Sequence, residues 1–227
     1  MSLKKFAKEL GNDRIEGELL KTIFISLFAS FAILAFLYFF KLRYIENFIP
    51  KYGIFLFLSI LSYALIIPSV KHVRAYREFA CMSGMMIGMT IGTIAGFLSG
   101  FYIGATNGIF IGGVFGMSLG IFLGIWNGKC CGIMGVMEGI MAGFMGGLMG
   151  AMTSVMMLND NLRIMAFIVF GLSGIILSGL NYMIYKETRE MEVQGNDDAF
   201  FTIFWSLLLT AITTGIMVFG PRSALFS

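Results

Sequence analysis

The stretch that decides the fold runs from residue 81 to residue 158 and reads CMSGMMIGMTIGTIAGFLSGFYIGATNGIFIGGVFGMSLGIFLGIWNGKCCGIMGVMEGIMAGFMGGLMGAMTSVMML. Glycine occupies every fourth position of this stretch from Gly84 to Gly132. Small residues at this spacing let two helix backbones approach closely, and such packing is a main source of helix association in lipid. Because Asn107 and Gly108 are typical of a tight turn, the stretch is predicted to form antiparallel helices over 81–103, 109–126 and 132–158.

Four more apolar stretches flank this region, at 19–40, 53–70, 164–185 and 200–219. Of the 227 residues, 58% are apolar and only 13% are charged, about half the charge of a soluble domain, which excludes a water-soluble fold. Each stretch is near the roughly 20 residues that a helix needs to cross a bilayer, and none alternates like a β-barrel strand. We expect an all-α integral membrane protein with about seven transmembrane helices and a tightly packed glycine-rich core formed by the third to fifth helices.

The charged residues predict the organisation and the orientation of the chain. Residues 1–18 are expected to form a cytoplasmic or interfacial N-terminal segment, and 19–220 a single helical membrane domain with its core at 81–158. With the N-terminus inside, 11 of the 16 Lys and Arg residues lie on the inner side and 5 on the outer side. This bias favours a cytoplasmic N-terminus in the cell membrane. The lipid bilayer is therefore the expected partner, and no basic patch for nucleic acid is visible.

Methionine is concentrated in the same region, with 13 of the 18 methionines between Met82 and Met157. At 100° per residue, the seven methionines from Met134 to Met156 fall within about 60° of one line, opposite the glycines. Glu138, the only acidic residue deep inside a predicted span, shares their side. An ionised group there costs roughly 2.5–3.5 kcal/mol, so this side is expected to face the bundle interior or an aqueous path. The alternative is a protonated Glu138 bonded to a neighbouring carbonyl group.

Thioether and thiolate sulfurs are soft ligands that select Cu(I), or Ag(I) as its mimic. The candidate metal ligands gather at the predicted cytoplasmic ends of the third and fifth helices: Cys81, Met82, Met85, Met86, Cys130, Cys131, Met134 and Met137. Thiols on that side of the membrane stay reduced, which makes a structural disulfide less favoured. The candidate ion pathway continues along Glu138, Met141, Met145 and Met149. The competing interpretation is that methionine fills irregular gaps beside the glycine-lined helices.

Helix packing is the expected role of the glycines. The candidates are Gly84, Gly88, Gly92, Gly96, Gly112, Gly116, Gly120, Gly135, Gly139, Gly143 and Gly147. No strand precedes them, so they do not form a phosphate-binding loop.

The spacing of the methionines and glycines resembles that of the Ctr family of copper channels. The resemblance covers Met85 and Met89, then Met141, Met145 and Met149, together with the glycine stripes. It implies copper(I) as the ion. That family has three helices per chain against the seven expected here, and no residue takes its role from the resemblance.

The leading hypothesis is a transport protein that moves or binds Cu(I) or Ag(I) along the methionines, with the cysteines as a cytoplasmic cluster. Copper(I) is the only cofactor or bound ion indicated. Two alternatives stay open: a channel or carrier for another solute or for protons that uses Glu138, and a non-transporting subunit or homo-oligomer scaffold. An enzyme is not expected, because no catalytic set of residues occurs at useful spacing. The single histidine, His72, is predicted to lie on the surface of a basic inner loop.

Overall fold

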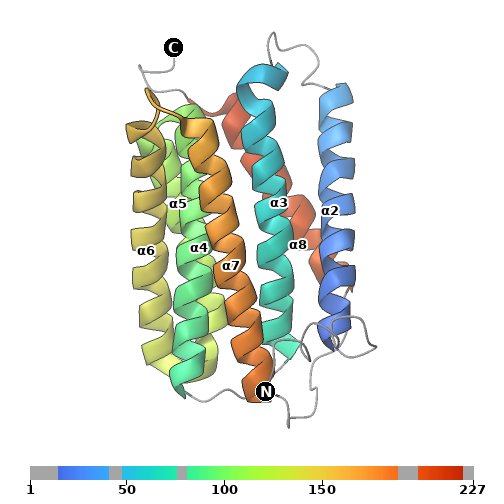
Figure 1. Ribbon diagram of the computed structural model, residues 1–227, viewed down its shortest axis with the longest axis vertical. Coiled ribbons are helices and arrows are strands. Elements are labelled where there is room, and N and C mark those ends of the chain that lie inside the picture. The colour runs from blue at the N-terminus through green and yellow to red at the C-terminus, as the bar shows by residue number, and fades with distance from the viewer. Residues whose placement is uncertain (1–14, 41–47, 76–80, 189–198, 222–227) are drawn as a thin grey trace.

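The computed structural model describes residues 15–40, 48–75, 81–188 and 199–221. Every regular element in these residues is a helix and none is a strand, which confirms the all-α class. Residues 1–14, most of the predicted N-terminal segment, lie outside the described residues. The elements are α2 (Ile15–Phe40), α3 (Phe48–Ala75), α4 (Cys81–Asn107), α5 (Ile109–Gly128), the short 3-10 helix η2 (Lys129–Cys131), α6 (Gly132–Met156), α7 (Leu162–Thr188) and α8 (Ala199–Phe219) (Figure 1).

Five helical stretches in the described residues are long and apolar enough to cross a membrane. They are Tyr52–Val73, Met82–Asn107, Ile109–Met156, Leu162–Glu187 and Thr202–Phe219. The third of them contains α5, η2 and α6, which fold back on one another, and α2 contributes a shorter apolar stretch, Thr22–Phe36. Large apolar side chains such as Phe28 and Phe110 are exposed on the outside of the bundle. A molecule with this surface is suited to lipid and not to water.

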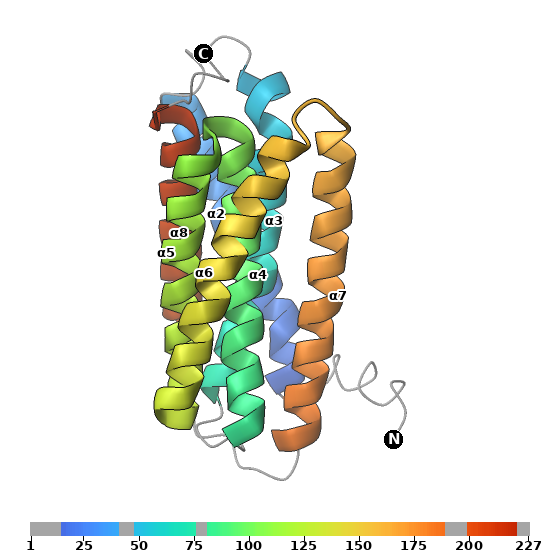
Figure 2. The same cartoon turned by 90° about the vertical axis from the view of Figure 1, so that its left-hand side faces the viewer.

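Helices α4, α5 and α6 run up, down and up beside one another (Figure 2). Gly108 makes the first turn with a φ angle of 107°, and Gly132 follows the second turn with a φ angle of 67°. Residues with a Cβ atom rarely adopt these angles, so both reversals depend on glycine. We call the end with Cys130 and Cys131 the cysteine end, and the other, with the α6–α7 turn at residues 157–161, the turn end.

Glycine backbones form the contacts among these three helices. A Cβ atom added at Gly88 would lie 2.9 Å from the Cα atom of Gly128, and one at Gly120 would lie 2.9 Å from the Cα atom of Gly143. At every one of the predicted packing glycines except Gly84, an added Cβ atom would come within 3.2 Å of the backbone of a neighbouring helix. Only glycine allows this separation, because any larger side chain would overlap the facing backbone.

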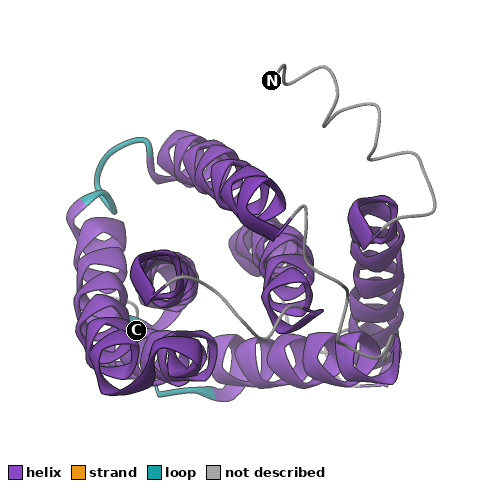
Figure 3. Cartoon of the chain, turned by 90° about the horizontal axis from the view of Figure 1, so that it is seen from below, coloured by secondary structure: helices purple, strands orange, loops and turns teal. Residues whose placement is uncertain are grey.

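The remaining helices lie to one side of this three-helix unit. Figure 3 shows the described helices from below, and α3 is in contact with α2, α4, α7 and α8. Among the described residues, helix α6 has its main contacts with α4, α5 and η2, and in Figure 2 no other described helix stands in front of it. The other four helices therefore do not surround the glycine-rich unit on the side of α6.

Candidate functional site

The methionines of α6 lie on the outside of the molecule. We define the methionine face as Met134, Met137, Met141, Met145, Met149, Met152 and Met156, whose side chains are 46–75% exposed. The glycine side of α6 is buried because α4 and α5 reach the helix backbone there. The opposite side must then point away from the unit. In a single chain, the expectation that the methionines face the bundle interior is wrong.

Glu138 is exposed on the same side of α6. It lies six residues after Gly132, about 9 Å along the helix axis at 1.5 Å per residue, midway between the start of α6 and its middle at residue 144. The exposure corrects the sequence-based expectation of a carboxyl group that faces the bundle interior. The periodicity places Glu138 on the same side of α6 as the methionines. Because that side is exposed, Glu138 is exposed as well.

The methionines of α4 add to this surface at the cysteine end. Met82, Met86 and Met89 are exposed, whereas Met85 is half-buried. Helices α4 and α6 both begin at this end, so Met82, Met86 and Met89 lie at the level of the first turns of α6 (Figure 1). Cys81 begins α4, but its side chain lies outside the described residues.

The sulfur atoms of Cys130 and Cys131 lie close together at the cysteine end of the three-helix unit. Their sulfurs are 3.9 Å apart, and the Cys130 thiol donates a hydrogen bond to the Asn127 carbonyl oxygen at 3.4 Å. A disulfide needs about 2.05 Å between the sulfurs, so the two residues do not form one with each other. Both sulfurs lie against Gly84 of α4, where a Cβ atom would collide with them. Glycine at this position leaves the space that the sulfurs occupy.

The separation of the two sulfurs suits a shared soft ion. With metal–sulfur bonds of about 2.3 Å, sulfurs 3.9 Å apart subtend an angle of about 115° at the metal. That angle lies between the trigonal and tetrahedral values and leaves room for a third ligand, for which thioether sulfur is suited. The described residues contain no group of three or more His, Cys, Asp and Glu side chains that could hold a metal ion. A site here therefore depends on two thiolates and methionine.

His72 is not on a loop surface. It lies in the last turns of α3 with 1% of its surface exposed, and its Nδ1 atom is 3.4 Å from Oδ1 of Asn181 in α7. The Asn181 side-chain amide donates to the Ser69 hydroxyl at 3.2 Å. The prediction of a surface histidine is wrong because α3 continues to Ala75, beyond the apolar run that ended at residue 70.

Sequence reasoning also missed a series of buried hydroxyl groups between α2 and α8. They stand at four-residue steps in both helices and are all buried: Thr22, Ser26 and Ser30 in α2, and Thr202, Ser206 and Thr210 in α8. The Thr210 hydroxyl donates to that of Ser30 at 3.1 Å. Small hydroxyl residues at this spacing are typical of helix contacts in membranes, and the spacing is the signal that would have identified them.

Comparison of the chain with protein-family models, with curated proteins and with solved structures finds no match.

Proposed function

We propose that this protein moves a soft monovalent metal ion, Cu(I) with Ag(I) as its substitute, along the methionine face, with Cys130 and Cys131 as the site at its cytoplasmic end. The observation that carries the proposal is that the sulfur-bearing side chains follow one another from the cysteine pair along the whole of α6. The sulfurs of the cysteine pair lie 3.9 Å apart directly before α6, and the methionine face begins in the first turn of that helix and continues to its last turn. A series of weak thioether sites lets an ion enter and leave, which conduction requires.

The proposal includes seven crossings of the membrane, with α5 and α6 counted separately and α2 counted as one. It also places the N-terminus in the cytoplasm, following the 11 to 5 distribution of Lys and Arg. A membrane-impermeant thiol reagent tests this orientation. It should leave Cys130 and Cys131 unlabelled in intact cells and label them after permeabilisation, and labelling in intact cells would reverse the orientation.

A second copy of the chain is part of the proposed path. On one chain the methionine face and Glu138 are exposed, and a path for ions needs a wall on the side of the lipid. A homo-oligomer in which methionine faces lie opposite one another supplies that wall and removes Glu138 from lipid contact. The same exposure favours the second candidate function, a non-transporting subunit whose methionine face docks a partner helix.

Metal loading of the purified full-length protein separates the two functions. Reduced protein incubated anaerobically with excess Cu(I) and desalted should retain at least one copper per chain, with sulfur as the nearest neighbour in X-ray absorption. Cys130→Ser combined with Cys131→Ser should lose this copper and keep the unfolding temperature, because serine keeps the shape without the soft ligand. Met165, Met183 and Met217 lie away from the methionine face, and their triple change to Leu is the matched control that should keep the copper. Copper retained equally by the double Ser variant would contradict the cysteine site.

A further inference from the structure

A second possible site lies at the turn end, far along the bundle from the cysteine pair. A cavity of about 510 Å³ opens there between the first turns of α3, the last turn of α4 and the α6–α7 turn. Its walls are largely apolar, with Phe55, Leu162 and Ile164 among them, while Arg163, Asn161 and Asp160 supply charge and hydrogen-bonding groups. The cavity is therefore amphipathic.

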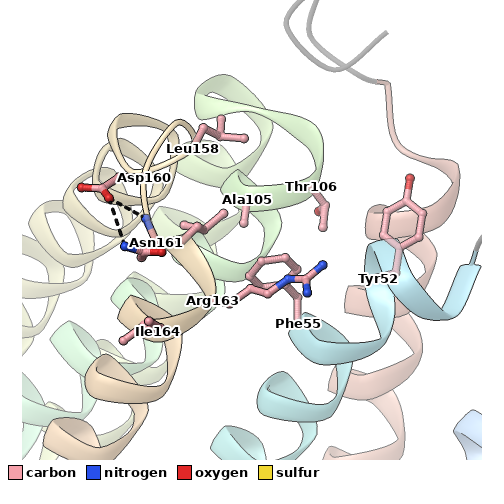
Figure 4. Close-up of a pocket in the computed structure, with 10 residues that line it drawn as sticks. Tyr52, Phe55, Ala105, Thr106, Leu158, Asp160, Asn161, Arg163 and Ile164 are labelled. Atoms are coloured by element: carbon pink, nitrogen blue, oxygen red, sulfur yellow. Dashed lines mark hydrogen bonds between the residues drawn. The ribbon is translucent and has the colours of Figure 1, made fainter.

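Arg163 supplies the positive charge of this cavity. Figure 4 shows its side chain reaching from the first turn of α7 across to Phe55 of α3. A guanidinium group recognises phosphate oxygens with two parallel hydrogen bonds, and the dipole at the N-terminus of a helix also favours negative charge.

Asp160 sets a limit on the charge of the ligand. Its carboxylate accepts a hydrogen bond from the backbone N–H of Asn161 at 2.8 Å and lies 3.4 Å from the Asn161 side-chain nitrogen. In Figure 4 these contacts are on the side of the turn away from Phe55. The lining of the cavity holds one carboxylate and one guanidinium, which disfavours a ligand with two negative charges. A phosphodiester carries one charge, and an amine on the same head group would be attracted to Asp160.

The position of the cavity indicates the rest of the ligand. The apolar stretch Met82–Asn107 ends at this level, and Leu162–Glu187 begins there. In a bilayer, that level lies where the hydrocarbon meets the head groups, so the Arg163 guanidinium there is within reach of lipid phosphate oxygens. We infer that this cavity binds a phospholipid, with the phosphodiester at Arg163, an amine-bearing head group toward Asp160 and acyl carbons against Phe55 and Ile164. The inference does not depend on metal transport.

Native mass spectrometry of the full-length protein in detergent tests the inference. Delipidated protein is titrated with phosphatidylethanolamine, phosphatidylglycerol, diacylglycerol or inorganic phosphate. We expect phosphatidylethanolamine to bind at one site per chain, at least about tenfold more tightly than diacylglycerol, which lacks the phosphodiester. Phosphatidylglycerol should bind more weakly than phosphatidylethanolamine because it lacks the amine. Inorganic phosphate that binds alone and displaces the lipid would overturn the phospholipid assignment.

Variants identify the residue responsible. Arg163→Gln should weaken phosphatidylethanolamine binding about tenfold or more. Arg163→Lys should weaken it less, because lysine keeps the positive charge and loses only the planar guanidinium group that donates two parallel hydrogen bonds. Lys129→Gln, which removes a positive charge from an exposed position at the cysteine end, is the control and should bind as the wild type does. Arg163 is exposed, and the unfolding temperature of each delipidated variant separates a loss of lipid binding from a loss of folding. Equal lipid affinity in Arg163→Gln and wild type would overturn the inference.

Discussion

Glu138 is the residue whose placement matters most for function. An ionised carboxyl group in contact with hydrocarbon costs about 2.5–3.5 kcal/mol at the centre of a helix and less near its ends, where a side chain can extend toward water. Glu138 lies in the second turn of α6, exposed and on the methionine face. At that place a carboxylate can balance the charge of a cation that passes from the cysteine pair to the methionines.

We predict that Glu138→Gln reduces ion flux without changing stability. Glutamine keeps the size and the hydrogen-bonding capacity of the side chain but cannot carry a negative charge, so the attraction for a cation is lost. In liposomes, Ag(I) flux should fall about tenfold at pH 8. Glu187→Gln, at the end of α7, is the control. Identical flux for Glu138→Gln and wild type would make Glu138 structural.

Residue-level features differ in how far the sequence could predict them. Periodicity correctly placed Glu138 and Met134 on one side of a helix and Gly139 on the other, since this follows from 100° per residue alone. The glycine spacing also predicted which side packs against neighbouring helices. Whether the methionine side is covered as well depends on where the other helices lie, and no pattern within α6 contains that information. His72 shows the same limit, because its burial comes from α7, a helix distant in sequence.

At the scale of the helices, glycine determines how closely α4, α5 and α6 approach. We predict that Gly143→Leu destabilises the protein by about 3 kcal/mol or more, the upper part of the range for overpacking. The added atoms would overlap the backbone of Gly120 and Ile121 in α5. The thermal unfolding midpoint in detergent measures the loss.

Gly179 of α7 provides the control for this substitution, because an added Cβ atom there has no heavy atom within 4 Å. Gly179→Leu should leave the unfolding midpoint unchanged or slightly raised, since leucine also favours helix over glycine. If Gly143→Leu is as stable as Gly179→Leu, close backbone packing does not hold the three helices together.

The helix positions were largely predictable, because apolar runs separated by charge follow from the thickness of the bilayer. The turn at Asn107 and Gly108 was predictable from its residues, and the structure places a positive φ angle at Gly108. The ends of α3 were not. The helix continues through Pro68 and past Lys71 to Ala75, because a helix does not have to end where its side chains become polar.

For the whole molecule, the one-sided arrangement of the helices leaves α6 uncovered, which leads to a prediction about assembly. Paired methionine faces would bring Met145 of two copies close together. Met145→Cys in a background with Cys81, Cys130 and Cys131 changed to Ser should form a disulfide-linked dimer in membranes on mild oxidation. Ile175→Cys, on the exposed side of α7, should crosslink much less. Equal crosslinking at both positions would indicate random collision and would contradict the paired face.

The measurement that tests the central claim most directly is Cu(I) or Ag(I) flux in liposomes that contain the full-length protein. Met134→Leu, Met137→Leu and Met141→Leu combined keep volume and apolarity and remove three sulfurs, a change that costs little stability. We predict that this variant folds as the wild type does and loses at least about 90% of the flux, whereas the control with Leu at Met165, Met183 and Met217 keeps it. Flux equal to that of the wild type in the methionine-face variant would contradict transport along this face and leave the methionines with a packing or docking role.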